Sequence, residues 1–287
     1  MIMKTFAETY IRRAEIAQLI ILHQLYMHKD SHDLIFQGGT AIRWCYGGNR
    51  FSEDIDFVTP LEPEAVDKIL AAVLKGAQKV MIAHFGIGSV NLRDKSTRAG
   101  AVKCFVDFLP EKSRDKISIK LEFEKLALGK LPQTKNHVLS SLPSVTYLIS
   151  SGEFLVPRPH AVIIAQTPVE ILSDKVRSLL ERRYLKGRDF FDIWYLRNAL
   201  KTDVDAANVE NKFSMYQAPF TARRDLDFFA APTKETTKAI REAIETDLSR
   251  FLPPDILDVY RAEEYAAFLD AAYSLFAALK KKGLRLP

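Results

Sequence analysis

A glycine pair followed by a threonine, Gly38-Gly39-Thr40, constrains the fold of this chain more than its other segments do. The apolar residues 34–36 before it predict a short strand, and residues 40–46 after it can form one or two helical turns. Glycine lets the backbone turn sharply and brings its N–H groups close to a ligand, because no side chain intervenes. A strand that turns directly into a helix therefore indicates an α/β fold with an accessible helix start at the turn.

The start of this short helix is suited to binding an anion. The first N–H groups of a helix have no partner within the helix, and the positive end of the helix dipole lies beside them. The hydroxyl of Thr40 adds a further donor. The segment therefore predicts a cradle for phosphate groups, and a triphosphate fits this description.

Two acids separated by one residue follow in residues 51–58, an apolar segment that predicts a second strand. Side chains alternate between the faces of a strand, so Asp54 and Asp56 are expected on one face. Their Cα atoms would lie about 6.5 Å apart, which suits two metal ions about 4 Å from each other. Carboxylate oxygens suit Mg²⁺ or Mn²⁺, which also bind substrate phosphates. The acid pair therefore predicts a metal site.

Each feature alone has an ordinary structural explanation. Glycine pairs are common in turns, and paired acids are common on the solvated face of a strand. Their combination is more informative, because the phosphate cradle and the two acids are expected to meet at one edge of the same sheet.

The rest of the N-terminal half mixes helical and strand patterns. Helices are expected over residues 8–28 and 64–77, from the 3.6-residue spacing of their apolar side chains. Further strands are expected in segments rich in Val, Ile and Phe, namely residues 80–84, 89–93, 102–108 and 117–123. This half is therefore predicted to be a mixed α/β fold.

The second half of the chain has helical patterns. Thr167, Pro168 and Glu170 together have the composition of a helix start, with a capping hydroxyl, a proline in the first turn and an acid three residues after the cap. Further helices are expected at residues 189–200, 234–251 and 263–282.

A boundary between two lobes is expected near residue 165, after Pro157 and Pro159. It divides the chain into a lobe of residues 1–165 and a lobe of residues 166–287. The length of 287 residues is enough for two small domains.

Charge and cysteine content limit the class of protein. Lys and Arg (41) exceed Asp and Glu (36), and the net charge of +5 favours phosphate-bearing partners. Cys45 and Cys104 each lie in an apolar stretch, which indicates buried thiols, a reducing compartment and no disulfide. The longest uncharged run near the N-terminus, residues 16–27, is too short to cross a bilayer. We therefore expect a cytoplasmic protein with no membrane partner.

Residues 38–43 followed by residues 50–57 resemble the signature of the AbiEii/AbiGii-type nucleotidyltransferase toxins, a branch of the polymerase β-like superfamily. The resemblance implies a nucleotidyltransferase-like lobe, with a mixed sheet and flanking helices, followed by a mainly helical lobe. It also implies that the glycine turn holds nucleotide phosphates and that Asp54 and Asp56 bind divalent metal. The nucleotide-binding candidates in these segments are Gly38, Gly39, Thr40, Arg43, Arg50 and Ser52.

The resemblance further implies a third acid on a later strand. Alternation within residues 117–123 places Lys120 and Glu122 on the polar face, so Glu122 is a candidate catalytic acid and metal ligand, and Lys120 a candidate nucleotide ligand. The charged outer face of an ordinary exposed strand explains the same pattern. Asp107 is the alternative third acid.

A second block, residues 169–194, also resembles the family. It implies that Lys175 binds phosphate or stabilises its charge, and that Asp189 is a further essential acid with Arg188 beside it as a nucleotide ligand. The ordinary alternatives are a solvated helix face for Lys175 and a helix N-cap for Asp189.

The activity implied by the resemblance is transfer of a nucleoside monophosphate from a nucleoside triphosphate (NTP) to an acceptor hydroxyl, with release of pyrophosphate. Family members are toxins of toxin–antitoxin or phage-defence systems, and some resemble enzymes that add nucleotides to the 3′ end of tRNA. The implied partners are an NTP, Mg²⁺ or Mn²⁺, an RNA acceptor, with tRNA favoured, and an antitoxin protein. A protein or small-molecule acceptor, phosphoester hydrolysis, and a nucleotide- or RNA-binding module without catalysis remain alternatives.

Overall fold

The computed structural model describes residues 6–112, 115–156 and 160–287 of the chain, so Pro157 and Pro159 lie outside the described residues. The chain forms two compact units, residues 8–166 and residues 167–287, and residues 6 and 7 group with the second. We call residues 8–166 the sheet unit and residues 167–287 the helical unit.

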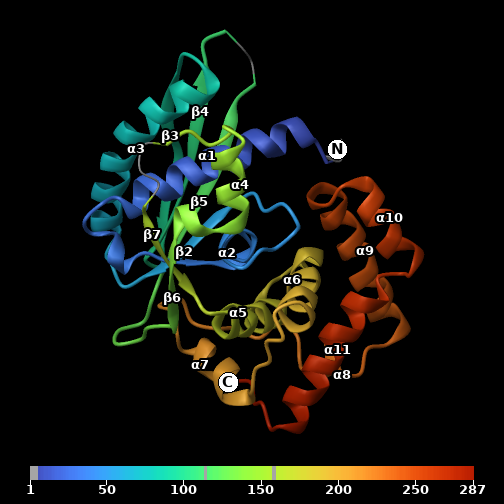
Figure 1. Ribbon diagram of the computed structural model, residues 1–287. Coiled ribbons are helices and arrows are strands. Elements are labelled where there is room, and N and C mark those ends of the chain that lie inside the picture. Colours follow the sequence, from blue (N-terminus) through green and yellow to red (C-terminus); the bar gives the residue numbers. More distant parts are fainter. Residues whose placement is uncertain (1–5, 113–114, 157–159) are drawn as a thin grey trace. The chain divides into compact units, whose positions relative to one another are not determined.

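A seven-stranded mixed sheet forms the centre of the sheet unit (Figure 1). Its strands are β1 (Ile35–Gln37), β2 (Ile55–Thr59), β3 (Gly88–Arg98), β4 (Ala101–Pro110), β5 (Ile117–Lys125), β6 (Thr134–Val138) and β7 (Val162–Gln166). They lie in the order β3-β4-β5-β2-β1-β7-β6. The pairs β1–β7 and β2–β5 are parallel, and the other neighbours are antiparallel. The mixed α/β class predicted from the sequence is confirmed.

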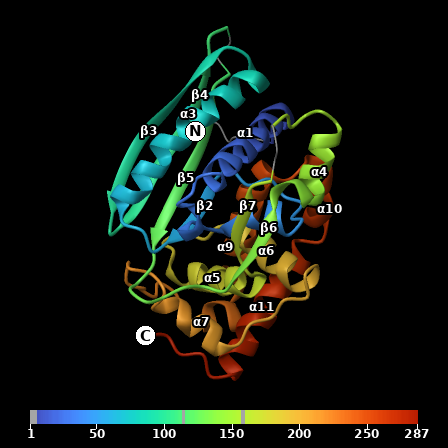
Figure 2. The same cartoon turned by 60° about the vertical axis from the view of Figure 1, so that its left-hand side comes forward.

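Helices α1 (Glu8–Tyr26) and α3 (Pro63–Phe85) lie side by side against one face of the sheet (Figure 2). Helix α3 contacts β3 and β4, and Phe85 meets the ring of Phe108 at 5.6 Å between centroids. The helices α2 (Gly38–Cys45) and α4 (Pro143–Ser150) complete the unit, together with two short 3₁₀ turns at Ser31–Asp33 and Leu139–Ser141.

The opposite face of β3, β4 and β5 carries charged side chains, and we call it the polar face. Antiparallel register places its residues beside one another, because paired residues in neighbouring strands point the same way. The paired positions include Arg93 with Phe105, Asp107 with Ser118, Phe105 with Lys120, and Lys103 with Glu122.

The helical unit contains α5 (Pro168–Glu181), α6 (Gly187–Asn198), α7 (Ala206–Phe213), α8 (Asp227–Ala230), α9 (Lys234–Phe251), α10 (Pro254–Ala262) and α11 (Ala266–Lys281). Helix α6 packs against α5, α9 and α11. Aromatic side chains fill the core, with Phe268 lying 5.3 Å from the rings of both Phe191 and Trp194. The predicted start of α5 is confirmed, since the side chain of Thr167 accepts the backbone N–H of Glu170.

One predicted element is wrong. Residues 80–84 are not a strand but the last turns of α3, which continues through Gly76. That glycine lets α3 approach α1 closely, because a Cβ there would overlap the side chain of Gln24. The helix predicted over residues 263–282 is confirmed as α11, which begins later, at Ala266, because Glu264 and Tyr265 have positive φ and separate it from α10.

The structure also describes the two cysteines and the apolar helices. Cys45 and Cys104 are buried free thiols, as expected. Among the described residues, no helix is both long enough and apolar enough to span a bilayer.

Candidate active site

The glycine turn carries β1 directly into α2, which begins at Gly38. Gly38 has a φ of +76°, a left-handed conformation that favours glycine. A Cβ at this position would lie 2.9 Å from Oδ2 of Asp56. Glycine is therefore required here by the backbone and by the approach of the acid, and the Asp56 carboxylate adjoins the start of the helix.

Arg50 and Ser52 cover the second glycine of the turn. A Cβ at Gly39 would clash with Nη2 of Arg50 and would lie 3.0 Å from Oγ of Ser52. The guanidinium of Arg50 is buried, and its Nη1 donates to the carbonyl of Phe51 at 2.9 Å. A guanidinium and a hydroxyl, both good donors to phosphate oxygens, thus lie at the first turn of α2.

Thr40 positions the acid segment with its side chain. Its buried hydroxyl donates to the backbone carbonyl of Asp54, so its contribution to an anion site is its backbone N–H. The residues before β2 are also held by Gln18 of α1, whose Nε2 donates to the carbonyls of Ser52 at 2.6 Å and Glu53 at 3.2 Å. The sequence analysis did not predict this role of Gln18. An amide side chain within an apolar helix face nevertheless indicates a buried hydrogen bond, because buried polar groups are normally paired.

The acids meet a lysine at the junction of β2 and β5. Asp54 precedes the first residue of β2, so the strand predicted from residue 51 begins later than expected. Asp56 lies in β2 and pairs in register with Glu122 of the parallel neighbour β5. Nζ of Lys120 lies 3.4 Å from Oδ2 of Asp54 and 2.8 Å from Oε2 of Glu122. Lys103 of β4 reaches the other oxygen, Oε1 of Glu122, at 2.5 Å.

The pKa shifts of Lys120 and Glu122 reflect these contacts. Burial would lower the pKa of Lys120, but Asp54, Glu122 and then Asp56 outweigh burial and raise it. Burial would raise the pKa of Glu122, but Lys120 and Lys103 outweigh it and lower that pKa. The three carboxylates and the two lysines therefore form one interacting group, which we call the acidic cluster.

The donor chemistry of the acidic cluster fits a hard divalent cation. Its carboxylate oxygens are the ligands that Mg²⁺ and Mn²⁺ prefer, and a cationic ammonium group already lies between two of them. Within the described residues, however, no group of three or more Asp, Glu, His or Cys side chains converges as a ready ligand set.

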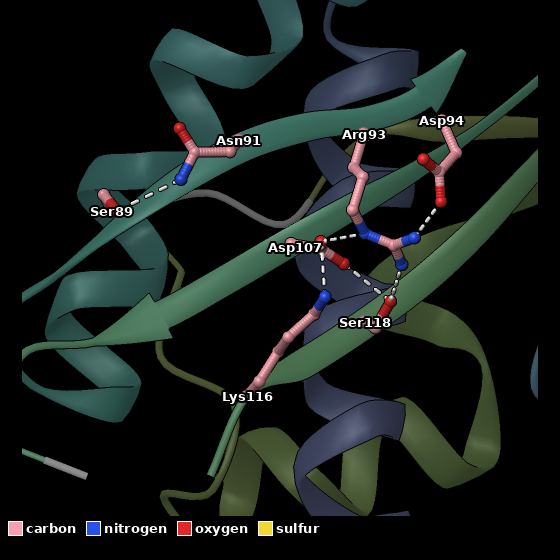
Figure 3. Close-up of polar contacts among 7 residues, drawn as sticks. All are labelled: Ser89, Asn91, Arg93, Asp94, Asp107, Lys116 and Ser118. Carbon is pink, nitrogen blue, oxygen red and sulfur yellow. Dashed lines mark hydrogen bonds and ion pairs between the residues drawn. The ribbon is translucent and has the colours of Figure 1, made fainter. Parts of the chain in front are cut away.

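Asp107, the alternative third acid, is engaged elsewhere on the polar face (Figure 3). Its Oδ2 lies 2.7 Å from both Nε of Arg93 and Nζ of Lys116, and its Oδ1 accepts the hydroxyl of Ser118 at 2.6 Å. Burial would raise the pKa of Asp107, but these three partners lower it. Ser118, its register partner, is four residues from Glu122, about 13 Å along the strand. The structure thus places Glu122, and not Asp107, beside Asp56.

Arg43 lies in the last turn of α2, at the opposite end of the helix from the glycine turn. Its Nε is 2.8 Å from Oε1 of Glu15 in α1, and its Nη1 donates to the carbonyl of Gly48 at 2.9 Å. The pair with Glu15 ties α2 to α1.

The second block forms a buried ion network inside the helical unit. Nζ of Lys175 lies 2.7 Å from Oδ1 of Asp189 and 2.6 Å from Oδ2 of Asp192, and Arg182 also pairs with Asp189. Burial would raise the pKa of Asp189, but Arg182 and Lys175 hold it well below its ordinary value. Arg188 donates its backbone N–H to Asp247 at 3.4 Å.

Both ordinary alternatives for this block are therefore wrong. Lys175 does not lie on a solvated helix face, because it is only 7% exposed. Asp189 is not a helix cap, because α6 has Lys186 as its N-cap and Asp189 lies within the first turn, fully buried.

A second buried lysine was missed. Lys212 of α7 is 1% exposed and places Nζ 2.5 Å from Oε2 of Glu170 and 2.8 Å from Oδ2 of Asp174, both on α5. The hydroxyl of Tyr216 also donates to Asp174. The i, i+4 spacing of the two acids was visible in the sequence, but their distant partner was not.

Comparison with known proteins identifies the family. No curated protein matches the sequence. Two crystal structures from Helicobacter pylori align along nearly the whole chain. One is a candidate nucleotidyltransferase (TM-score 0.48, 18% identity, 96% of this chain and 97% of that chain), and the other is JHP933 (TM-score 0.44, 17% identity, 97% and 96%). The family model described as "Nucleotidyl transferase AbiEii toxin, Type IV TA system" matches residues 20–270. The chain therefore belongs to the AbiEii nucleotidyl transferase toxin family of type IV toxin–antitoxin systems.

Proposed function

We propose that this protein transfers a nucleoside monophosphate from an NTP to an acceptor hydroxyl and releases pyrophosphate. The observation that carries the proposal is the position of Asp56, whose Oδ2 lies 2.9 Å from the Cβ position of Gly38 at the start of α2. A helix start suited to phosphate and a carboxylate suited to metal thus adjoin each other. Membership of the AbiEii family supports the same class of reaction.

The residues of the sheet unit have distinct roles in this proposal. The backbone N–H groups of residues 38–40 and the guanidinium of Arg50 bind the triphosphate oxygens. Asp54, Asp56 and Glu122 hold Mg²⁺ or Mn²⁺, which when bound lowers the pKa of the acceptor hydroxyl and neutralises charge on the phosphates.

The expected chemical roles of Lys175, Asp189 and Arg188 stay predictions. The double ion pair of Lys175 supports a structural role for it within the helical unit. The variant Lys175→Arg separates the two roles, because it keeps the positive charge but not the compact ammonium group. A normal unfolding midpoint with lost turnover would indicate a chemical role.

We propose RNA, with tRNA favoured, as the acceptor. Four cationic side chains of the polar face support a polyanionic acceptor, because phosphate contacts from Lys and Arg supply most non-specific affinity for nucleic acid. They are Arg93, Lys103, Lys116 and Lys120, each of which is also paired with a carboxylate in this structure. The net charge of +5 has the same sign. Inhibition of translation, countered by the product of an antitoxin gene, is the biological role that we propose from the family.

The test incubates the full-length chain with each α-phosphate-labelled NTP, Mg²⁺, total cellular RNA and total cellular protein. We expect the label in RNA of tRNA size, stoichiometric pyrophosphate release, and loss of both when the metal is chelated. Labelled protein, or free nucleoside monophosphate without labelled RNA, would overturn the acceptor or the transfer reaction. Nucleotide binding that needs no metal and yields no pyrophosphate would indicate a binding module instead.

The matched variants are Asp56→Asn and Asp30→Asn. Asp56→Asn is expected to reduce turnover more than about 100-fold with an unchanged circular dichroism spectrum, because it removes a metal ligand. Asp30→Asn makes the same chemical change at an exposed position of the sheet unit and is expected to leave turnover unchanged. Unchanged turnover in Asp56→Asn, or its unfolding, would overturn the assignment of this site.

A further inference from the structure

Lys120 lies between the acids where a divalent cation is expected. We propose that Lys120 is an internal counter-ion of the acidic cluster: its ammonium group must leave Asp54 and Glu122 before a divalent cation binds there, and an incoming triphosphate draws it away. This inference rests on the proposed function. It adds that the binding of the metal and the binding of the triphosphate are coupled, because both depend on the position of the Lys120 side chain.

The contacts of Glu122 show why the metal cannot simply enter. One carboxylate oxygen lies 2.5 Å from Nζ of Lys103 and the other lies 2.8 Å from Nζ of Lys120. The same Lys120 nitrogen is 3.4 Å from Oδ2 of Asp54. A cation that used either Glu122 oxygen would meet an ammonium group at contact distance, and two cations at that separation repel strongly.

Charge balance links the metal to the triphosphate. The three carboxylates and two ammonium groups of the acidic cluster leave a formal charge of −1. While both lysines remain, one divalent cation would change this formal charge to +1 and two would change it to +3, so entry of the metal alone is unfavourable. A triphosphate supplies the compensating negative charge, and its oxygens offer Lys120 an alternative partner.

Lys120 is suited to this exchange. Its side chain is 29% exposed, and its carboxylate partners are 24% and 25% exposed, so water can replace either contact. Lysine carries a point charge on a flexible stem and can change partners without a backbone movement. The glycine turn lies beside Asp56, which is the register partner of Glu122, so the new partner is close to the old one.

Isothermal titration calorimetry of Lys120→Gln tests the proposal with two opposite readouts. The first is the affinity for Mn²⁺ alone, which is expected to increase about fivefold or more, because a competing cation is removed. The second is the affinity for inorganic triphosphate in the presence of chelator, which is expected to fall about fivefold, because the ammonium group is no longer available. A variant that merely distorts the site would weaken both.

Lys116→Gln is the charge-matched control. It removes one positive charge from the same polar face, but its ammonium group pairs with Asp107, about 13 Å or more along β5 from Glu122. Screening over that distance should leave both affinities within about twofold of wild type.

The outcomes separate this inference from the proposed function. Unchanged or weaker Mn²⁺ binding by Lys120→Gln overturns the counter-ion role. If Asp56→Asn still abolishes Mn²⁺ binding in that case, the proposed metal site stands. If neither the wild type nor Lys120→Gln binds Mn²⁺, both the inference and the proposed metal site fail.

Discussion

The two units each hold a lysine between two carboxylates, but in different surroundings. In the sheet unit, the side chains of Lys120, Asp54 and Glu122 are 24–29% exposed. In the helical unit, the side chain of Lys175 is 9% exposed and those of Asp189 and Asp192 are 0% and 1% exposed. Similar chemistry therefore occurs in contact with water in the sheet unit and in the core of the helical unit.

Burial decides what such a group can do. Ion pairs that water can reach contribute about 0–1 kcal/mol to stability, so their partners can be exchanged for a ligand. Loss of one member of a buried pair costs about 3–5 kcal/mol, because the remaining charge has neither water nor a partner. We infer that the pair in the sheet unit is available for chemistry and that the pair in the helical unit maintains the packing of α5 against α6.

The two tryptophans of the chain allow this comparison to be measured in each unit. Trp44 lies in α2 of the sheet unit and Trp194 in α6 of the helical unit. In a Trp44→Phe background, fluorescence reports unfolding of the helical unit. In a Trp194→Phe background, it reports unfolding of the sheet unit.

The largest effect is expected for Lys175→Met. It leaves the buried carboxylate of Asp192 without its lysine and should lower the free energy of unfolding of the helical unit by about 3–5 kcal/mol. Urea denaturation followed by Trp194 measures this change. Lys280→Met is the matched control, because its pair with Asp227 is more than half exposed and should contribute less than about 1 kcal/mol. Equal effects of the two variants would contradict the comparison.

The next effect is expected for Gly38→Ala. Alanine at a φ of +76° is strained, and its Cβ would press on the carboxylate of Asp56, so the sheet unit should lose about 1–3 kcal/mol. Denaturation followed by Trp44 measures the loss. Gly129→Ala is the matched control, since its φ is +72° but a Cβ there would meet open space. The difference between the two variants isolates the contact with Asp56, and no difference would argue against that contact.

Acid should destabilise both units, and the helical unit more strongly. The pKa of Asp189 is lowered well below its ordinary value of 3.8, and that of Glu122 is lowered from 4.5. A carboxylate whose pKa is lowered by folding stabilises the protein above its ordinary pKa, and this stability is lost as the pH falls toward the folded value. The urea midpoints measured between about pH 7 and pH 3 should decrease mainly below about pH 4.5. The decrease should be steeper for the helical unit, as followed by Trp194 fluorescence. A flat Trp194 profile would show that Asp189 is not ionised in the core.

The smallest effect is expected for Lys120→Gln. Because its ion pairs are partly exposed, the free energy of unfolding of the sheet unit should change by less than about 1 kcal/mol. Denaturation followed by Trp44 in the Trp194→Phe background measures it. A loss comparable with that of Lys175→Met would mean that both lysines serve structure alone.

Much of the fold followed from local patterns. The alternation in β5 predicted which side chains share the polar face, and Thr167 predicted the start of α5, because both depend on neighbours a few residues away. The strand prediction for residues 80–84 was wrong because it relied on Val and Ile, which suit strands. In the structure these residues continue α3, which packs closely against Gln24 at Gly76. That contact joins segments about fifty residues apart, so no local pattern contains it.

In the candidate site, too, some features could be predicted from the sequence and others depend on tertiary packing. Spacing along the chain was sufficient to indicate a glycine turn near two acids, since the conformational freedom of glycine and the period of a strand are properties of short segments. Long-range packing alone selected Glu122 rather than Asp107 as the neighbour of Asp56, brought Lys103 and Lys120 to its oxygens, and buried Lys175 against α6. Strand register and helix packing are decided by contacts between distant segments, and one-dimensional spacing does not encode which segments will meet.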